Sequence, residues 1–184
     1  MNEKQKTISA SRCVMTEIVL PNDTNGFGNM MGGRLMYLMD KCAAISAQRH
    51  ANRVCVTASV DTVEFRTPIR EGEILTIEGC VTRVFRSSME VQLVVTAENA
   101  LENTRRVCNK AFFTFVAIDD CGRSTPAPQI YPETPAEQVL YNSAAKRREA
   151  RLYLSGRLRL EDSTYLLSDL LSAIASFGVE DAPS

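Results

Sequence analysis

The segment between residues 21 and 40, PNDTNGFGNMMGGRLMYLMD, carries an amide and a carboxylate on either side of a glycine-rich loop. Asn25 precedes the loop, and Asp40 lies in the apolar stretch that follows it. Between them, Gly32 and Gly33 leave backbone N–H groups uncovered at the expected start of a helix. Unpaired donors and the helix dipole attract anions and developing oxyanions at such a position. These residue types in this order indicate chemistry at a carbonyl group.

Nucleophilic and metal-dependent alternatives have less support in the sequence. His50 is the only histidine, so a Ser-His-Asp or Cys-His arrangement would depend on it alone. It lies at the expected end of the helix, where a histidine often interacts with exposed carbonyls. Walker, HExxH and GxGxxG motifs are absent. The six cysteines are scattered without a CxxC pair, so we expect reduced structural thiols and no metal site.

Composition bounds the class of protein and its partners. The 184 residues are 45% hydrophobic and 23% charged, which is ordinary for one soluble domain. A formal net charge of −1 favours no nucleic-acid partner. No apolar run reaches the roughly 20 residues that a membrane span needs, and the start MNEKQKTISA lacks the apolar core of a signal peptide. We therefore expect a cytoplasmic protein without a membrane partner.

The hydrophobic pattern predicts the elements that must position these groups. One apolar helical pattern covers residues 33–49, and β-branched and aromatic residues predict strands on both sides of it. These strands are expected at residues 11–20, 54–63, 74–85, 89–97 and 106–118. A single helix among antiparallel strands predicts the α+β class. One face of such a sheet lacks a cover within the chain, which favours self-association.

The character of the chain changes after residue 119. Four prolines between residues 126 and 135 are typical of a linker, and a helix with a basic cluster is expected at residues 138–154. A serine-capped amphipathic helix is expected at residues 163–177. The predicted organisation is a main domain over residues 1–130 and a C-terminal helical extension and tail over residues 131–184.

The run TNGFGNMMGGRLMYLMDKCAAISAQRHAN resembles the hotdog-fold acyl-CoA thioesterases, of the bacterial short-chain and cytosolic long-chain types. The segments VTASVDTVEFRTPIREGE, RVFRSSMEVQLVV and KAFFTFVAID follow in register, so the likeness covers roughly residues 11–153. The resemblance implies a long central helix wrapped by a five-stranded antiparallel sheet. It also implies homodimers with continuous sheets, assembled as trimers of dimers into a homohexamer.

The activity implied by the resemblance is hydrolysis of acyl-CoA to free fatty acid and coenzyme A. Coenzyme A enters as part of the substrate, and no separate cofactor is expected. Asn25 and Asp40 match the two catalytic positions, one from each subunit of a dimer. Asp40 serves as general base or as nucleophile, Asn25 orients the water or the carbonyl, and amides near Gly32 and Gly33 form the oxyanion hole.

The resemblance also implies substrate-binding positions. Thr57 lies in a strand that faces the site, and Arg86, Ser87 and Ser88 match an element near the coenzyme A phosphates and pantetheine. The planar fork of an arginine suits phosphate. Two other functions stay open for this fold. One is a non-catalytic acyl-CoA-binding protein, and the other is a 3-hydroxyacyl thioester dehydratase, which generally pairs a histidine with a carboxylate.

Overall fold

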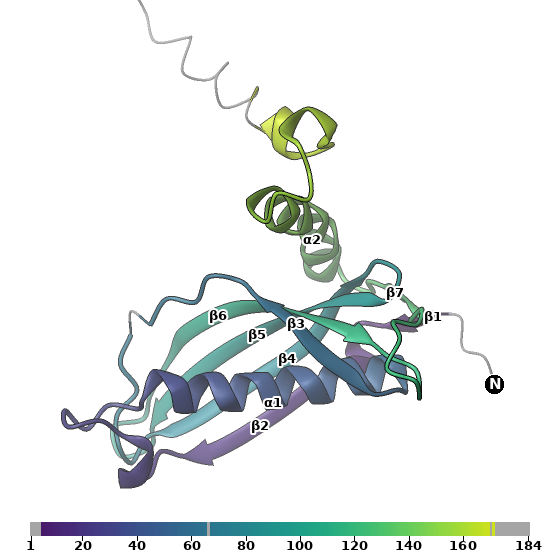
Figure 1. Cartoon of the computed structure of the whole chain (residues 1–184). Coiled ribbons are helices and arrows are strands. Elements are labelled where there is room, and N and C mark those ends of the chain that lie inside the picture. Colours follow the sequence, from purple (N-terminus) through teal and green to yellow (C-terminus); the bar gives the residue numbers. More distant parts are fainter. Residues whose placement is uncertain (1–4, 66, 170, 172–184) are drawn as a thin grey trace, which may run out of the picture. The chain divides into compact units, whose positions relative to one another are not determined.

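The computed structural model describes residues 5–65, 67–169 and 171. The chain divides into two compact units, residues 1–137 and 138–184. The first unit contains one long helix and the main sheet (Figure 1). Each unit is considered by itself below.

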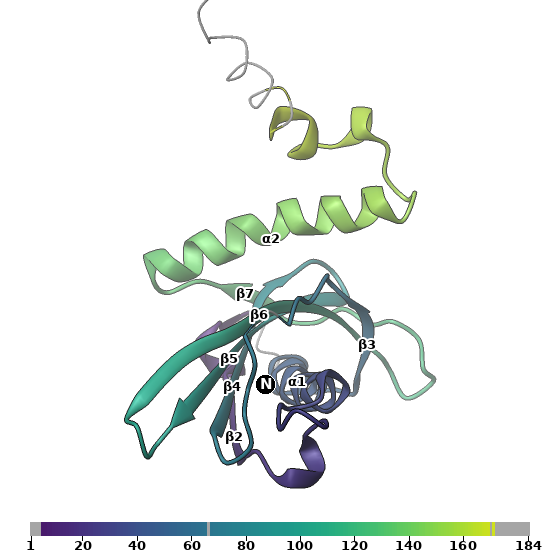
Figure 2. The same ribbon diagram turned by 90° about the vertical axis from the view of Figure 1, so that its left-hand side faces the viewer.

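The main sheet of the first unit has five antiparallel strands in the order β2-β4-β5-β6-β3. In chain order the elements are β2 (Cys13–Ile18), α1 (Gly32–Ala51), β3 (Cys55–Val60), β4 (Ile74–Val84), β5 (Ser88–Asn99) and β6 (Thr104–Ala117). Figure 2 shows the sheet curving around α1. The α+β class and the hotdog arrangement of helix and sheet are therefore confirmed.

The central helix α1 is buried along one side for most of its length. Leu35, Leu38, Met39, Cys42 and Ala43 recur at helical spacing and are buried against the sheet. The 20 residues of α1 extend about 30 Å. In the described residues, neither α1 nor any other helix is both long and apolar enough to span a membrane.

The helix α1 packs tightly against the sheet at Gly79 on β4. A Cβ atom built there would lie 2.9 Å from Ser46 Oγ and 3.1 Å from both Cys42 Sγ and Leu93 Cδ2. Real Cβ atoms essentially never come as near as the first of these distances. Glycine at this position therefore sets the depth at which the helix packs, and with it the position of the helix side chains.

Replacing Gly79 with alanine should lower the free energy of unfolding by about 1–3 kcal/mol, because the added methyl group overpacks the helix–sheet contact. Urea unfolding followed by circular dichroism measures the change. The matched control is Gly26→Ala, where a methyl group meets nothing within 4 Å. Equal stability of the two variants would contradict the packing argument.

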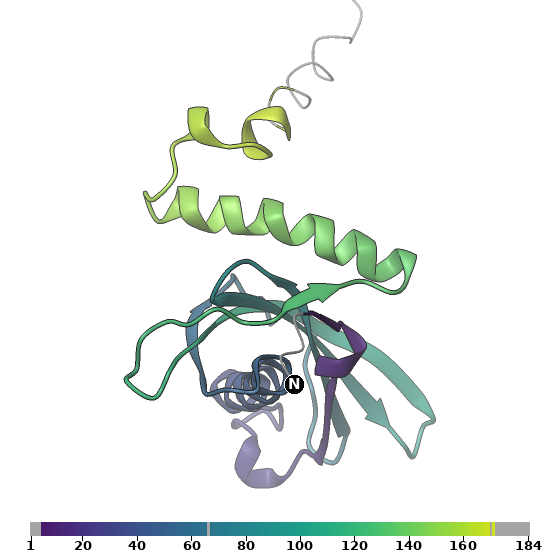
Figure 3. The same cartoon turned by 90° about the vertical axis from the view of Figure 1, so that its right-hand side faces the viewer.

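A second, two-stranded sheet joins distant parts of the chain. β1 (Gln5–Thr7) runs parallel to β7 (Gln129–Tyr131) (Figure 3). The prediction of a surface linker around the prolines is therefore wrong at β7. Ala127 N donates to Arg86 O at 3.0 Å, and His50 Nε2 lies 2.7 Å from Pro128 O. His50 is fully buried, and this burial lowers the pKa of its imidazole.

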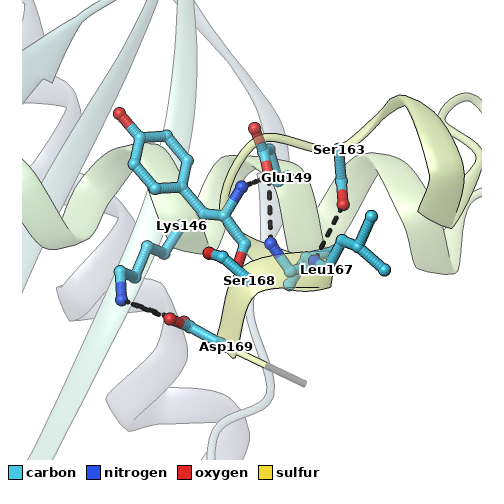
Figure 4. A network of polar contacts seen from close by, with 8 residues as sticks. Lys146, Glu149, Ser163, Leu167, Ser168 and Asp169 are labelled. Atoms are coloured by element: carbon cyan, nitrogen blue, oxygen red, sulfur yellow. Dashed lines mark hydrogen bonds and ion pairs between the residues drawn. The ribbon is translucent and has the colours of Figure 1, made fainter. Parts of the chain in front are cut away.

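The second unit contains most of α2 (Pro135–Leu154), whose first three residues belong to the first unit. Glu149 accepts hydrogen bonds from the backbone N–H groups of Thr164, Tyr165 and Leu166, at 3.0, 2.8 and 3.3 Å. Lys146 Nζ contacts both carboxylate oxygens of Asp169, at 2.8 and 2.9 Å (Figure 4).

The predicted helix at the end of the chain begins later than expected, at residue 166. Ser163 Oγ accepts the N–H of Leu167 at 3.0 Å, and residues 166–169 are helical (Figure 4). The prediction that Ser163 caps a helix over residues 163–177 is wrong in position, because Tyr165 O accepts the first helical bond, from Asp169 N at 2.9 Å. Residue 170 and residues 172–177 lie outside the described residues.

Candidate active site

Asp40 is held by a hydrogen bond from the neighbouring strand. It lies on α1, half-buried, and Thr57 on β3 donates its Oγ1–H to Asp40 Oδ1 at 2.7 Å. A hydroxyl bonded to a carboxylate makes a charge-assisted hydrogen bond, which is stronger than a neutral one. The bond fixes the orientation of the carboxylate group. The structure thus brings together two of the residues predicted for the site.

The hydrogen bonds of Asn25 determine which way the oxygen and the nitrogen of its side-chain amide face. Its Oδ1 accepts the backbone N–H groups of Phe27 at 2.9 Å and Asn29 at 3.3 Å, while Gly28 N donates to Asn25 O. Asparagine commonly closes turns in this way. Because both partners of the side-chain oxygen are donors, Oδ1 must face the loop. The Nδ2 amide points away, so Asn25 presents N–H groups to whatever lies beyond.

The start of α1 supplies further donors. The helix begins at Gly32, and its first N–H groups have no partner within the helix. The N–H of the preceding Met31 is already bonded to Asp23 O at 2.9 Å. A Cβ atom at Gly32 would lie 3.5 Å from the ring of Phe65, whereas one at Gly33 would meet nothing within 4 Å. Glycines therefore keep this helix terminus accessible to a small group.

The loop that carries Asn25 is anchored to α1 through Asp23, a residue that the sequence places only in a turn. Arg34 Nε donates to Asp23 Oδ1 at 2.8 Å, and Leu20 N donates to Asp23 Oδ2 at 3.2 Å. Arg34 also contacts Glu17 Oε2 at 3.2 Å. The buried carboxylate of Asp23 therefore links the turn to the first turn of the helix.

Within one chain, these residues form two candidate half-sites. The first half-site is Asn25 with the N–H groups of Gly32 and Gly33, and the second is Asp40 with Thr57. Asp40 follows Gly32 by eight residues on the same helix, which separates them by about 12 Å along its axis. Reacting groups need to approach within roughly 3–3.5 Å. The two half-sites of one chain therefore cannot act on the same carbonyl.

The predicted coenzyme A element forms the hairpin between β4 and β5. Phe85 N donates to Ser88 O, and Arg86 at the turn is exposed. In the sheet, Ser88 pairs with Val116, which pairs with Val56 next to Thr57. Two strand spacings separate Ser88 from Val56, or about 10 Å. The hairpin and Thr57 thus lie at the same end of the sheet.

The cysteines take no part in this arrangement. All six are free thiols, and Cys121 alone of them is exposed. Burial raises the pKa of Cys55 and of Cys80 to about 11 in each case. A thiol with so high a pKa stays protonated near neutral pH and is a weak nucleophile. This agrees with the prediction of structural cysteines.

The hotdog fold defines the class of protein, and comparison with known proteins identifies the family. Residues 27–103 match the family model of the thioesterase superfamily. An uncharacterized acyl-CoA thioester hydrolase of Bacillus subtilis is 42% identical over 141 residues, covering 77% of this chain and 82% of the relative. The human cytosolic acyl coenzyme A thioester hydrolase is 36% identical over 149 residues, which span 80% of this chain but 39% of that protein. The chain belongs to the thioesterase superfamily, among its acyl-CoA thioester hydrolases.

Solved structures agree with this assignment. The acyl-CoA hydrolase of Staphylococcus aureus, in complex with butyryl coenzyme A and coenzyme A, is 38% identical with a TM-score of 0.76, over 83% of this chain and 95% of that one. A hexameric acyl-CoA thioesterase is 39% identical with a TM-score of 0.80, over 84% and 99%. Three further structures of the Staphylococcus enzyme carry single alanine substitutions of an aspartate, an asparagine and a threonine.

Proposed function

We propose that this chain hydrolyses acyl-CoA to free fatty acid and coenzyme A, at a site shared between two copies. The observation that carries the proposal is the Thr57–Asp40 hydrogen bond, which holds a carboxylate ready as a base. The positions substituted in the Staphylococcus enzyme support it. There the asparagine precedes the aspartate by 15 residues and the threonine follows it by 17, the same spacings as Asn25, Asp40 and Thr57.

The mechanism follows from which groups of the site accept protons and which donate hydrogen bonds. Asp40 removes a proton from a water molecule as the water oxygen forms a bond to the thioester carbon. The carbonyl oxygen becomes an oxyanion, which accepts hydrogen bonds from Asn25 Nδ2 and from the N–H groups of Gly32 and Gly33. The intermediate collapses by breaking the carbon–sulfur bond. Coenzyme A leaves as a thiolate, and the proton held by Asp40 passes to the sulfur or to solvent.

The separation of the half-sites is the reason to place two copies at each site. β3 is an edge strand, and its Val56 and Val60 are 44% and 39% exposed. Unpaired strand edges readily pair with another chain, and symmetric dimers bury the same patch on both copies. Edge-to-edge pairing of β3 joins the two sheets and sets the Asp40 half-site of one copy beside the Asn25 half-site of the other. The hexameric relative supports further assembly into a hexamer, for which we propose an arrangement of three such dimers.

Arg86, Ser87 and Ser88 bind the coenzyme A moiety in this proposal. The exposed guanidinium of Arg86 offers paired, charge-assisted bonds to a phosphate, and the two hydroxyl groups offer additional donors. The position of the hairpin, about 10 Å from β3 across the sheet, suits a ligand whose thioester lies beside Thr57 and whose nucleotide extends outward.

Release of free thiol from a panel of acyl-CoAs, from acetyl to palmitoyl, tests the proposed function. Hydrolysis of any member supports the proposal and also gives the chain-length preference. Binding of acyl-CoA without turnover would replace it with a non-catalytic binding protein. Hydration of an enoyl-CoA would indicate a dehydratase instead. The structure weighs against that last outcome, because His50 is buried on Pro128 and lies about 15 Å along α1 from Asp40.

Thr57→Val should lower kcat by about 10-fold or more, because hydrogen bonds to charged groups contribute about 1.5–3 kcal/mol. Valine keeps the shape and strand preference of threonine but cannot donate to Asp40. Thr57→Ser is the matched control, because it retains the hydroxyl group, and it should stay close to the native rate. Steady-state thiol release measures both variants. Equal rates for valine and serine would show that the hydrogen bond is dispensable.

A further inference from the structure

We infer that Glu73 and Arg106 form a clamp that positions the Asn25 loop, residues 24–30, for the reaction. The inference rests on the proposed function, because it assigns a task to residues that do not touch the substrate. It concerns how the chain holds an exposed loop, which contains no helix or strand, to the accuracy that catalysis requires.

The Asn25 loop is bonded to a turn formed by residues 68–73. Met30 N donates to Ile69 O at 2.7 Å, and Glu71 N donates to Gly28 O at 3.0 Å. Asn29 also forms an isolated β-bridge with Arg70. The turn thus contacts the loop on the residues that follow Asn25, including Asn29, whose N–H bonds to the Asn25 side chain. A displacement of the turn therefore moves the Asn25 side chain.

The carboxylate of Glu73 holds the turn of residues 68–73 in place. Arg106 donates from both terminal nitrogens to the two oxygens of Glu73, each at 2.8 Å, and also donates to Pro68 O at 2.7 Å. Arg70 N donates to Glu73 Oε2 at 2.8 Å. One ion pair therefore fastens both ends of the turn, at Pro68 and at Glu73.

The other end of the clamp lies in the main sheet. Arg106 lies on β6, paired with Ala97 of β5 inside the main sheet. Glu73 is 5% exposed, so water competes little for its oxygens. The hydrogen bonds from Arg106 hold the pKa of Glu73 below its ordinary value, which keeps the pair charged near neutral pH. Contacts therefore run without a break from the sheet through the ion pair and the turn to the Asn25 loop.

The ion pair of Glu73 and Arg106 could position the Asn25 loop for catalysis or only stabilise the fold. These two roles predict different kinetics. Misplacement of a catalytic group by about 1 Å can lower the rate about 100-fold. Glu73→Gln weakens the two-point contact with Arg106 while keeping the shape of the side chain. It should therefore lower kcat by about 10- to 100-fold, with KM changed by less than about 3-fold. A merely stabilising pair would lower the melting temperature and leave kcat per folded enzyme unchanged.

A double-mutant cycle in the full-length protein tests the inference. Glu73→Gln is measured in the native chain and in Asn25→Ala, with thiol release and thermal unfolding for each. If Glu73 acts through Asn25, it should produce no further loss of kcat once the amide is gone. The matched control is Glu78→Gln, which breaks the exposed pair with Arg12 and should leave kcat native.

An equal loss of kcat in both backgrounds, or a native kcat for Glu73→Gln, would overturn the inference. Full turnover by Asn25→Ala would overturn the catalytic assignment of Asn25 and the clamp with it, so the two failures are distinguishable. If Glu73→Gln does not fold, Arg106→Lys enters the same cycle. Lysine keeps the charge but cannot form the two-pronged contact, and the same criteria then decide the question.

Discussion

Asp40→Asn should lower kcat for acyl-CoA hydrolysis by about 10²- to 10⁴-fold, the range that a positioned general base contributes. The substituted amide has almost the same shape, and its oxygen still accepts the hydroxyl of Thr57, now 2.7 Å from the carboxylate. It cannot take a proton from water. The fold, the oligomeric state and the affinity for acyl-CoA should stay native. Thiol release, size-exclusion chromatography and calorimetric binding check these outcomes.

Asp120→Asn is a suitable control for Asp40→Asn, because it makes the same change of charge at an exposed site beyond β6. It should keep native turnover, and native turnover of Asp40→Asn would refute the assignment of the base. Single turnover in ¹⁸O-labelled water tests for direct attack by the carboxylate. Label in Asp40 shows an anhydride whose aspartyl carbon is attacked by water, whereas general-base attack places label in the fatty acid alone. Trapping of the anhydride with hydroxylamine detects the nucleophilic route when water attacks the acyl carbon instead.

Replacing Asn25 with aspartate should be at least as harmful as replacing it with alanine, each lowering kcat by about 10²- to 10³-fold. Aspartate keeps an oxygen that accepts the N–H groups of Phe27 and Asn29, so the loop retains its turn. It replaces the outward N–H donors with a carboxylate oxygen, which repels an oxyanion. Steady-state kinetics of both variants across the acyl-CoA panel measure the effect.

The opposite order of the two variants would assign Asn25 a different task. If its side chain accepted a hydrogen bond from the attacking water, aspartate would preserve activity and alanine would not. Asn22→Asp adds the same charge in the preceding turn, at another exposed residue, and should leave kcat native. A loss in that control would show that charge near the loop suppresses activity without any contact to the reacting atoms.

The local periodicity of the sequence predicts the elements well. The helix expected at residues 33–49 is α1, Gly32–Ala51, because its apolar residues recur every three to four positions over five turns. The strand expected at residues 54–63 ends earlier, at Val60. Strand-like residue types continue beyond that point, but only pairing with β6 determines where the strand stops.

Contacts between distant segments could not be predicted in the same way. β1 and β7 are three-residue strands more than 120 residues apart, too short for any pattern. The bond between Thr57 and Asp40, and the ion pair of Glu73 with Arg106, depend on the register of the sheet. The residue types of the candidate site could be read from the sequence. The direction in which Asn25 points depends on backbone N–H groups that only the folded loop brings to it.

The placement of Gly32 and Asp40 on one helix has a consequence that can be tested genetically. In the symmetric pair proposed above, each chain lends its amide half-site to one reaction centre and its carboxylate half-site to the other. A mixed pair made from one chain lacking the Asn25 amide and one lacking the Asp40 carboxylate then contains one doubly defective centre and one intact centre. Two alleles that are each inactive alone should therefore complement one another when they are expressed together.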